Sequence, residues 1–103
     1  MAYELIVTEA AHSDLDEALD FIVHRLSNPT AAVSLLDQVE ACYGQLRNFP
    51  MLYEACRDPR LRDLGYRKVV IGHYILVYHP VEEERTVYVL RFFYGGRDYE
   101  KLI

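Results

Sequence analysis

The sequence has few cysteines, no long apolar run and a deficit of basic side chains. Its two cysteines, Cys42 and Cys56, are too few for a disulfide framework and lack the CxxC spacing of a redox or metal motif, so we expect reduced thiols. No apolar run approaches the roughly 18–20 residues that cross a membrane. The N-terminus becomes acidic too early for a signal peptide. We therefore expect a cytoplasmic protein with no membrane partner.

Two classes of ligand are disfavoured by the sequence. It contains no metal-binding or phosphate-loop motif, so we expect neither a metal nor a cofactor. The net charge of −5 is unlike that of a typical nucleic-acid-binding protein. The charge is uneven, however, because residues 1–56 hold two Lys/Arg against nine Asp/Glu, whereas residues 57–103 hold nine against seven. Any anion-binding site is therefore expected in the C-terminal half.

The length suits one domain that spans residues 1–103, with 51% hydrophobic residues available for a core. Residues 3–8 are short and β-branched, which predicts a strand. From residue 11 to residue 26 apolar side chains recur every three or four positions, which predicts an amphipathic helix capped by Thr8 or Ser13.

A second helix is predicted to follow at once. Asn28 and Pro29 break the first pattern and suit a cap and a first helical position, and the apolar stripe resumes as far as about residue 47. Two helices with so short a connection form an antiparallel hairpin. The next segment, residues 49–63, has two prolines and no period, which indicates an irregular connection with a helical turn near Pro59–Asp63.

The C-terminal part of the chain predicts three strands and a short tail. The strands are Gly65–Ile71, His73–His79 and Arg85–Tyr94, and they are separated by turns at Gly72-His73 and Pro80–Glu84. Such closely spaced strands form an antiparallel meander.

Side-chain alternation divides these strands into two sets, if no bulge intervenes. The tyrosine-rich set is Tyr66, Val70, Tyr74, Leu76, Tyr78, Tyr88, Leu90, Phe92 and Tyr94. The β-branched set is Arg67, Val69, Ile71, His73, Ile75, Val77, His79, Val87, Val89, Arg91 and Phe93. Both sets are largely apolar, but a helical hairpin covers one face only. We expect the tyrosine-rich set to pack on the helices and the β-branched set to be exposed.

An exposed apolar face of several hundred Å² usually marks a binding surface. We therefore expect a partner polypeptide to cover the β-branched face. The residues predicted to bind it are Arg67, Val69, Ile71, Ile75, Val77, Val87, Val89, Arg91 and Phe93. Alternatively, the segment 49–63 and the C-terminal tail fold over this face, and Arg91 pairs with a carboxylate in a structural role.

Several short motifs occur along the chain in a fixed order. They are T-x-x-A-x-x-D-L at residues 8–15, Asn28-Pro29, Gly65-Tyr66-Arg67, YILVY at 74–78, VYVLR at 87–91 and YGGRDY at 94–99. Taken together, over nearly the whole length, they resemble the toxins of the RelE/ParE superfamily of bacterial type II toxin–antitoxin modules.

The resemblance implies an α+β fold: a small, twisted, mainly antiparallel four-stranded sheet with an N-terminal helical hairpin packed on one face. It also implies a growth inhibitor that a cognate antitoxin neutralises by wrapping around it. A partner that covers the β-branched face agrees with this expectation.

The superfamily contains two mechanisms, and the sequence favours one of them. RelE-like members cleave messenger RNA on the ribosome, whereas ParE-like members inhibit DNA gyrase. RNA cleavage needs a base, an acid and positive charge, and the resemblance assigns Arg67, Arg97 and Tyr99 as catalytic candidates. Val69 and Ile75 are apolar where basic groups are expected. These losses and the negative net charge favour a ParE-like toxin that binds gyrase and is not an enzyme.

Two alternative functions are compatible with the same sequence. A RelE-like ribosome-dependent endonuclease is the first alternative, in which His73 or His79 would be further acid–base candidates. A non-toxic module that only binds its partner is the second alternative.

Overall fold

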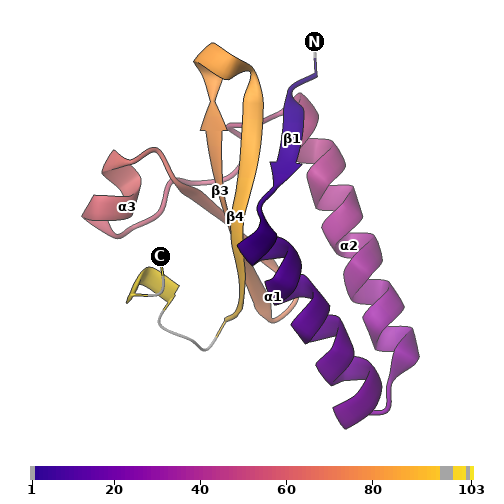
Figure 1. Cartoon of the computed structure of the whole chain (residues 1–103). Coiled ribbons are helices and arrows are strands. Elements are labelled where there is room, and N and C mark those ends of the chain that lie inside the picture. The colour runs from indigo at the N-terminus through magenta and orange to yellow at the C-terminus, as the bar shows by residue number, and fades with distance from the viewer. Residues whose placement is uncertain (1, 96–98, 102) are drawn as a thin grey trace.

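The N-terminal part of the chain forms a strand and a helical hairpin close to the predicted positions (Figure 1). The structure is a computed structural model that describes residues 2–95, 99–101 and 103. The strand is β1 (Glu4–Val7), and the two helices of the hairpin are α1 (Glu9–Asp20) and α2 (Pro29–Asn48). The side chains of Thr8 and Asn28 accept hydrogen bonds from the N–H groups of Ala11 and Ala31, at 3.2 and 3.1 Å. The caps expected at Thr8 and Asn28 are therefore confirmed.

A π-helical turn, η1 (Phe21–Arg25), connects the two helices and was not predicted. The N–H of Leu26 donates to the carbonyl of Phe21 at 3.2 Å, five residues earlier, so this turn is wider than an α-helical one. Ser27 then takes a φ of 49°, which reverses the chain before α2. The wide turn leaves Phe21 and Leu26 exposed at the end of the hairpin.

The remaining strands build the sheet. They are β2 (Arg67–Ile71), β3 (Tyr74–Val81) and β4 (Thr86–Tyr94), and the sheet order is β1-β4-β3-β2. The pairs β2–β3 and β3–β4 are antiparallel, whereas β1 is parallel to β4. The predicted α+β fold, with a mainly antiparallel four-stranded sheet, is confirmed. No helix in the described part of the chain is both long and apolar enough to span a membrane.

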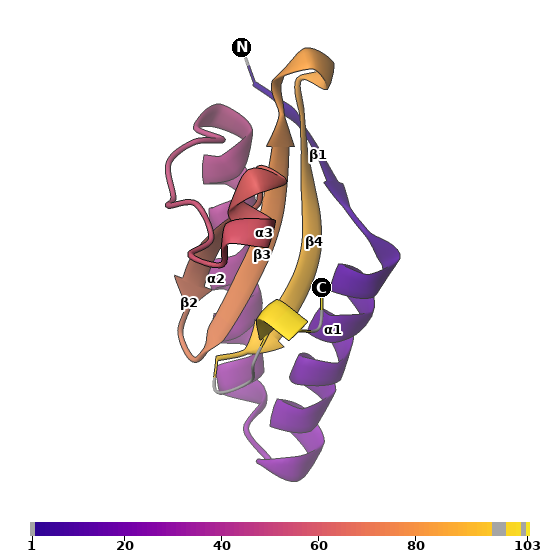
Figure 2. The ribbon, with the colours of Figure 1, turned by 90° about the vertical axis from the view of Figure 1, so that its left-hand side faces the viewer.

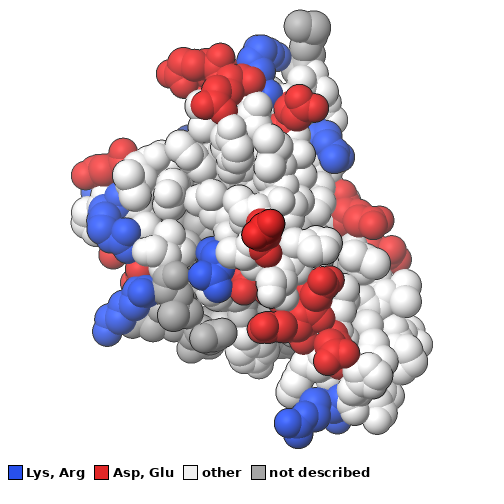
Figure 3. Space-filling model, viewed as in Figure 1, with Lys and Arg blue, Asp and Glu red and all other residues white. Residues whose placement is uncertain are grey.

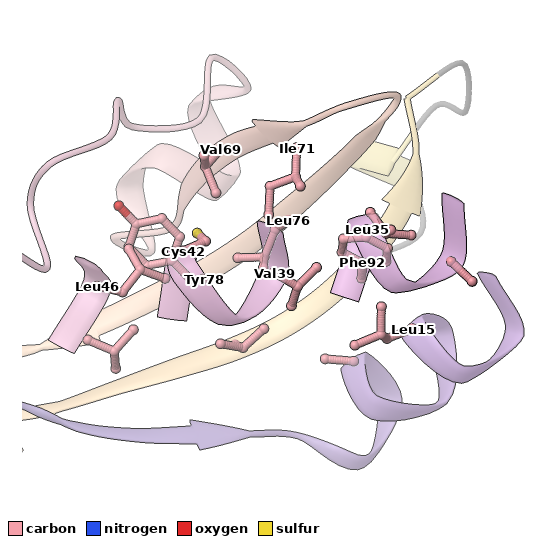
Figure 4. Packing of buried hydrophobic residues seen from close by; sticks show 14 of the residues in the cluster. Leu15, Leu35, Val39, Cys42, Leu46, Val69, Ile71, Leu76, Tyr78 and Phe92 are labelled. Carbon is pink, nitrogen blue, oxygen red and sulfur yellow. The ribbon is translucent and has the colours of Figure 1, made fainter. Parts of the chain in front are cut away.

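The main core lies between the sheet and the helical hairpin (Figure 4). α2 supplies Leu35, Val39 and Leu46, which pack against Leu76 and Tyr78 of β3. All these side chains are buried, because the apolar stripe of α2 faces the centre of the sheet along its length. This core fixes the position of α1 as well, since Leu15 joins it from the neighbouring helix.

The other face of the sheet is covered by the chain itself. A short helix, α3 (Pro59–Asp63), begins at the cap residue Asp58 and lies across the sheet on the side opposite to α2 (Figure 2). Its Leu61 forms a second buried cluster with Cys56, Val77 and Phe93. The C-terminal Ile103 packs against the same cluster. The expectation of an uncovered face is therefore wrong here, and the alternative, in which the connecting segment and the tail fold over it, is confirmed.

The two-residue turn between β2 and β3 explains part of this error. Ile71 pairs with Tyr74 across the turn, so an odd and an even residue share a face. Parity therefore reverses at Gly72, whose φ of 59° suits this tight turn. Val69 and Ile71 consequently face the helices with Leu76, not the opposite side with Val77.

A bulge in β4 reverses the parity a second time. Val77 pairs with Arg91, but its neighbour Tyr78 pairs with Val89, which leaves Leu90 as an extra residue in β4. Val89 and Phe92 thus lie on the helix side together, although the sequence placed them in different sets.

Most of the predicted partner-binding set is consequently buried. Val69, Ile71, Val87 and Val89 belong to the helix-side core, and Val77 and Phe93 lie in the cluster under α3. The members that remain partly exposed are Arg67, Ile75 and Arg91. The tyrosine-rich set is divided in the same way. Tyr66 and Leu90 pack against the α3 cluster, and Val70 and Tyr88 also face away from the helices.

Both cysteines are free, as expected, and both are buried. Burial raises the pKa of the Cys42 thiol to about 11 and the pKa values of the Tyr43 and Tyr78 phenols to about 12. In the unfolded chain these groups ionise near their ordinary pKa values of 9.0 and 10.0. The unfolded state therefore loses protons first as the pH rises, and it is favoured by alkaline pH.

We expect the free energy of unfolding to be constant up to about pH 9 and to fall as the pH rises further toward about 11–12. Urea titrations at a series of pH values would measure this decline. Tyr78→Phe removes one of the titrating groups, so the variant should show a shallower decline. A urea midpoint that stays constant from pH 9 to 11 would contradict the assignment.

Candidate functional site

Among the predicted catalytic residues Arg67, Arg97 and Tyr99, the structure describes the side chain of Arg67. Arg67 lies on the helix side of the sheet, paired with Tyr78, and its Nη1 donates to the carbonyl of Tyr53 at 2.6 Å. Ile75 lies on the opposite face, near the α3 cluster. Arg97 lies outside the described residues, and so does the side chain of Tyr99, whose backbone begins the turn η3 (Tyr99–Lys101).

The two histidines of the third strand are also separate. His73 is exposed in the β2–β3 turn. His79 lies near the other end of β3, half-buried, with its ring 5.2 Å from the ring of Tyr66. Their spacing of six residues places them at opposite ends of one strand, so they do not form a joint acid–base pair.

A bidentate ion pair joins α1 to β4. Arg91 donates from Nε to Oδ2 of Asp14 at 2.7 Å and from Nη2 to Oδ1 at 3.0 Å. Oδ2 also accepts the backbone N–H of Phe92 at 3.0 Å. These bonds raise the pKa of Arg91, and its guanidinium lies 4.6 Å from the centre of the Phe93 ring. The structural role considered for Arg91 is thus confirmed, and its partner is a residue of the T-x-x-A-x-x-D-L motif.

An open apolar groove lies beside this ion pair, and no sequence pattern predicted it. We call it the α1 groove, a hollow of about 760 Å³ between α1, η1, the start of α2 and the ends of β3 and β4. Its apolar lining includes Ala18, Phe21, Leu26, Tyr74, Phe92 and Tyr94. The sequence offered one signal for the groove, the large apolar residues Phe21 and Leu26 just after α1. Both side chains are exposed in the structure.

The aromatic floor of the α1 groove is firmly packed. The ring of Tyr74 stacks on Phe92 at 4.9 Å and meets Tyr94 edge-on at 5.6 Å. The backbone nearby is equally close, since Gly95 donates to the carbonyl of His73 at 2.6 Å. A Cβ at Gly95 would lie 2.8 Å from that oxygen, which makes glycine necessary here.

A smaller hollow of about 360 Å³ continues the groove around the β2–β3 turn. The two hollows share His73, Tyr74 and Tyr94, so they meet at the end of the sheet. On the far side the smaller hollow reaches Val70 and Ile75. The apolar track thus leads from the helical hairpin to the opposite face of the sheet.

Charges surround this track unevenly. α1 carries five Asp/Glu and no Lys or Arg in its sequence EAAHSDLDEALD. Figure 3 shows acidic side chains gathered over α1 and over the β3–β4 turn, basic ones near α3, and a largely uncharged surface between them. The exposed arginines of the α3 region are Arg57, Arg60 and Arg62.

The chemistry of the α1 groove suits binding better than bond cleavage. Its polar side chains are Asp14, Glu17, His73 and two tyrosines, and both oxygens of Asp14 are engaged by β4. Within residues 2–95, 99–101 and 103, no three His, Cys, Asp or Glu side chains lie together as a metal site. An aromatic floor and apolar walls are typical of surfaces that bind another polypeptide.

A family model described as "ParE toxin of type II toxin-antitoxin system, parDE" matches residues 5–99. The chain belongs to this ParE toxin family. The predicted membership of the RelE/ParE superfamily is thereby confirmed, and with it the general assignment as a toxin of a type II toxin–antitoxin system. No curated protein matches this ParE-family chain.

Solved structures of the superfamily share the fold of this ParE-family chain. The chromosomal ParDE system of P. aeruginosa aligns with a TM-score of 0.70 and 18% identity, covering 90% of this chain and 96% of that one. The RelBE2 toxin–antitoxin complex of Mycobacterium tuberculosis aligns at 0.64 and 23%, covering 91% and 99%. The intact E. coli RelBE complex aligns at 0.62 and 19%, covering 93% and 100%. At these identities the likeness shows the fold alone.

We expect Asp14→Asn to destabilise the protein by about 1–3 kcal/mol, because it weakens three hydrogen bonds and leaves the partly buried Arg91 without its counter-charge. Urea unfolding at pH 7 would measure the loss. Asp16→Asn is the matched control on the same helix, since Asp16 is exposed and should change stability by less than about 0.5 kcal/mol. Equal effects of the two substitutions would contradict a structural role for the ion pair.

Proposed function

We propose that this toxin inhibits growth by binding DNA gyrase, without cutting RNA, and that a cognate antitoxin neutralises it. The observation that carries the proposal is the separation of Arg67 from Ile75 on opposite faces of the sheet. These are two of the places where the resemblance to RelE-like toxins requires a shared catalytic surface. The match to the ParE family supports the same choice.

Cleavage of RNA requires its catalytic groups on one surface. A base must reach the attacking 2′-hydroxyl, while an acid and positive charge act on the same phosphate. Arg67 donates to the Tyr53 carbonyl on the α2 side of the sheet, whereas Arg91, which pairs with Asp14, extends from the side of the α3 cluster. Two cations on different faces do not act on one phosphate, so their placement favours protein–protein contact as the mode of action.

An antitoxin partner is proposed on two grounds. The family model concerns toxins of type II toxin–antitoxin systems, and two of the similar structures are described as toxin–antitoxin complexes. The exposed apolar groove of this chain gives such a partner a surface to cover.

Two assays on the purified chain distinguish the mechanisms. We expect it to abolish supercoiling by gyrase and to leave messenger RNA intact in a reconstituted translation reaction. Its expression alone should arrest growth. RNA cleavage with unaffected supercoiling would overturn the gyrase proposal, and it would direct attention to Arg67, Arg97 and Tyr99.

A substitution sharpens this comparison. If the chain were a nuclease that uses Arg67, then Arg67→Gln would lower the cleavage rate by about 100-fold or more. Under the gyrase proposal it should change the inhibitory concentration by less than about tenfold once the folded fraction, measured by circular dichroism, is taken into account. Arg62→Gln, an exposed arginine of α3, serves as the control for loss of one positive charge.

A further inference from the structure

One side of α2 turns away from the sheet and is open to solvent (Figure 2). The buried residues of α2 lie on the side that packs against the sheet. At spacings of three and four positions, the opposite side carries Leu36, Glu40, Gly44 and Arg47. We call these four residues, together with the turn at residues 49–52 that follows α2, the α2 outer face. None of them lines the α1 groove, so this is a separate surface.

Gly44 is the residue of the α2 outer face that the chain itself does not explain. It lies inside α2, where glycine is the least favourable residue after proline. A Cβ at this position would meet no atom within 4 Å, so packing inside the described chain does not require a glycine. Its φ is not positive, unlike those of Gly65 and Gly72. A glycine on the surface of a helix does, however, allow a second backbone to approach closely.

The turn that follows α2 presents large apolar side chains. Phe49, Met51 and Leu52 are 63%, 43% and 53% exposed. The turn is well held, because the N–H of Leu52 donates to the carbonyl of Phe49 at 3.1 Å and the next residue, Tyr53, donates from its hydroxyl to Gln45 of α2 at 2.7 Å. Exposed apolar side chains in a fixed arrangement favour contact with another polypeptide.

Two opposite charges lie on the same side of α2. Glu40 and Arg47 are both exposed, and seven positions separate them by about 10 Å along the helix, which is too far for them to pair. The ion pairs found in the described part of the chain involve neither side chain. A second helix that runs antiparallel to α2 would place a cation beside Glu40 and an anion beside Arg47 if it carried the same two residues in reverse order.

A second copy of α2 meets this condition. When two such helices pack antiparallel about a two-fold axis at Gly44, positions equally far before and after Gly44 lie opposite each other. Glu40, four positions before, then lies beside Arg47 of the second copy, three positions after. Leu36, eight positions before, lies opposite Leu52, eight positions after. Each contact occurs twice, and the two copies of Gly44 meet at the centre.

We propose that the α2 outer face binds a second copy of this chain in an antiparallel arrangement centred on Gly44. This inference goes beyond the proposed function and does not depend on it. The contact consists of two ion pairs between Glu40 and Arg47, a close approach of the two helix backbones, and apolar contacts between Leu36 and the turn at residues 49–52. Because the α1 groove lies elsewhere, the contact does not occupy it.

The charges of the α2 outer face disfavour other occupants. A nucleic acid would meet Glu40 and the neighbouring exposed Asp37, which repel phosphate groups. A polypeptide of one charge sign would be repelled by either Glu40 or Arg47. In the antiparallel arrangement Asp37, seven positions before Gly44, lies opposite the uncharged Met51, seven positions after. No like charges therefore meet, which is why a second copy fits this face best.

The association of the chain with itself gives the first test. We expect the full-length protein to be monomeric at about 1 μM and largely dimeric by about 500 μM in sedimentation velocity, because a contact between one helix and one turn is at the small end of specific interfaces. The experiment uses the toxin alone, so its result is independent of gyrase inhibition. A protein that stays monomeric at about 0.5 mM would overturn the proposal and leave this face to a different polypeptide.

Reversal of the two charges tests the antiparallel pairing. Glu40→Arg and Arg47→Glu should each weaken the dimer by about tenfold or more, because each places like charges side by side. The double variant restores both pairs and should return to within about threefold of the original dissociation constant. Glu83→Arg, an exposed substitution in the β3–β4 turn, is the matched control and should leave the dimer unchanged. A double variant as weak as either single variant would contradict the pairing.

Gly44→Gln separates binding from folding. The open space around Gly44 accommodates a side chain in the monomer, and glutamine is the better helix former, so the urea midpoint of the dilute protein should rise. The same side chain keeps the two helices apart, so the dimer should weaken by about tenfold or more. Unchanged dimerisation of this variant would exclude Gly44 as the centre of the contact and overturn the proposal.

Discussion

The carboxylate of Asp14 joins the helical hairpin of this structure, through α1, to the sheet, through β4. β1 ends at Val7, and beyond that point the next backbone donor along the edge of β4, the N–H of Phe92, bonds to Asp14 instead of to another strand. The bulge at Leu90 turns Arg91 toward the same carboxylate. The Asp14 carboxylate therefore accepts a backbone hydrogen bond that a further strand would otherwise accept, and it also neutralises the guanidinium of Arg91. Together with the packing of Leu15 in the core, this contact sets the position of α1 relative to the sheet, and hence the shape of the groove beside it.

Local sequence patterns predicted where the helices and strands lie along the chain. They did not predict which face of the sheet each strand residue occupies. The cap residues Thr8 and Asn28, the prolines and the 3.6-residue period marked the helices, because these signals act within a few residues. Which face a strand residue occupies depends on register. Register changed at the two-residue turn after Ile71 and at Leu90, and neither change alters the apolar pattern of the sequence.

The candidate site was predictable only in part for a similar reason. The sequence marked Arg91 as a possible partner of a carboxylate and the C-terminal half as mildly basic. The α1 groove, in contrast, is assembled from residues that are distant along the chain, such as Phe21 and Tyr94. The π-helical turn η1 forms part of one wall of the groove. The close approach of Gly95 to the backbone of His73 determines where the groove ends. Family membership and fold were therefore accessible from motifs, whereas the binding surface required the three-dimensional arrangement.

The cluster of Cys56, Leu61, Val77 and Phe93 has a consequence for the lifetime of the protein. Because α3 covers this cluster on the second face of the sheet, the cluster is buried within the chain itself. Loss of the partner would then expose the groove without unfolding the domain. A chain with a buried core of its own is expected to open rarely, and cleavage by a protease requires opened segments. The time over which the free chain stays folded would thus be governed by the stability of its own core.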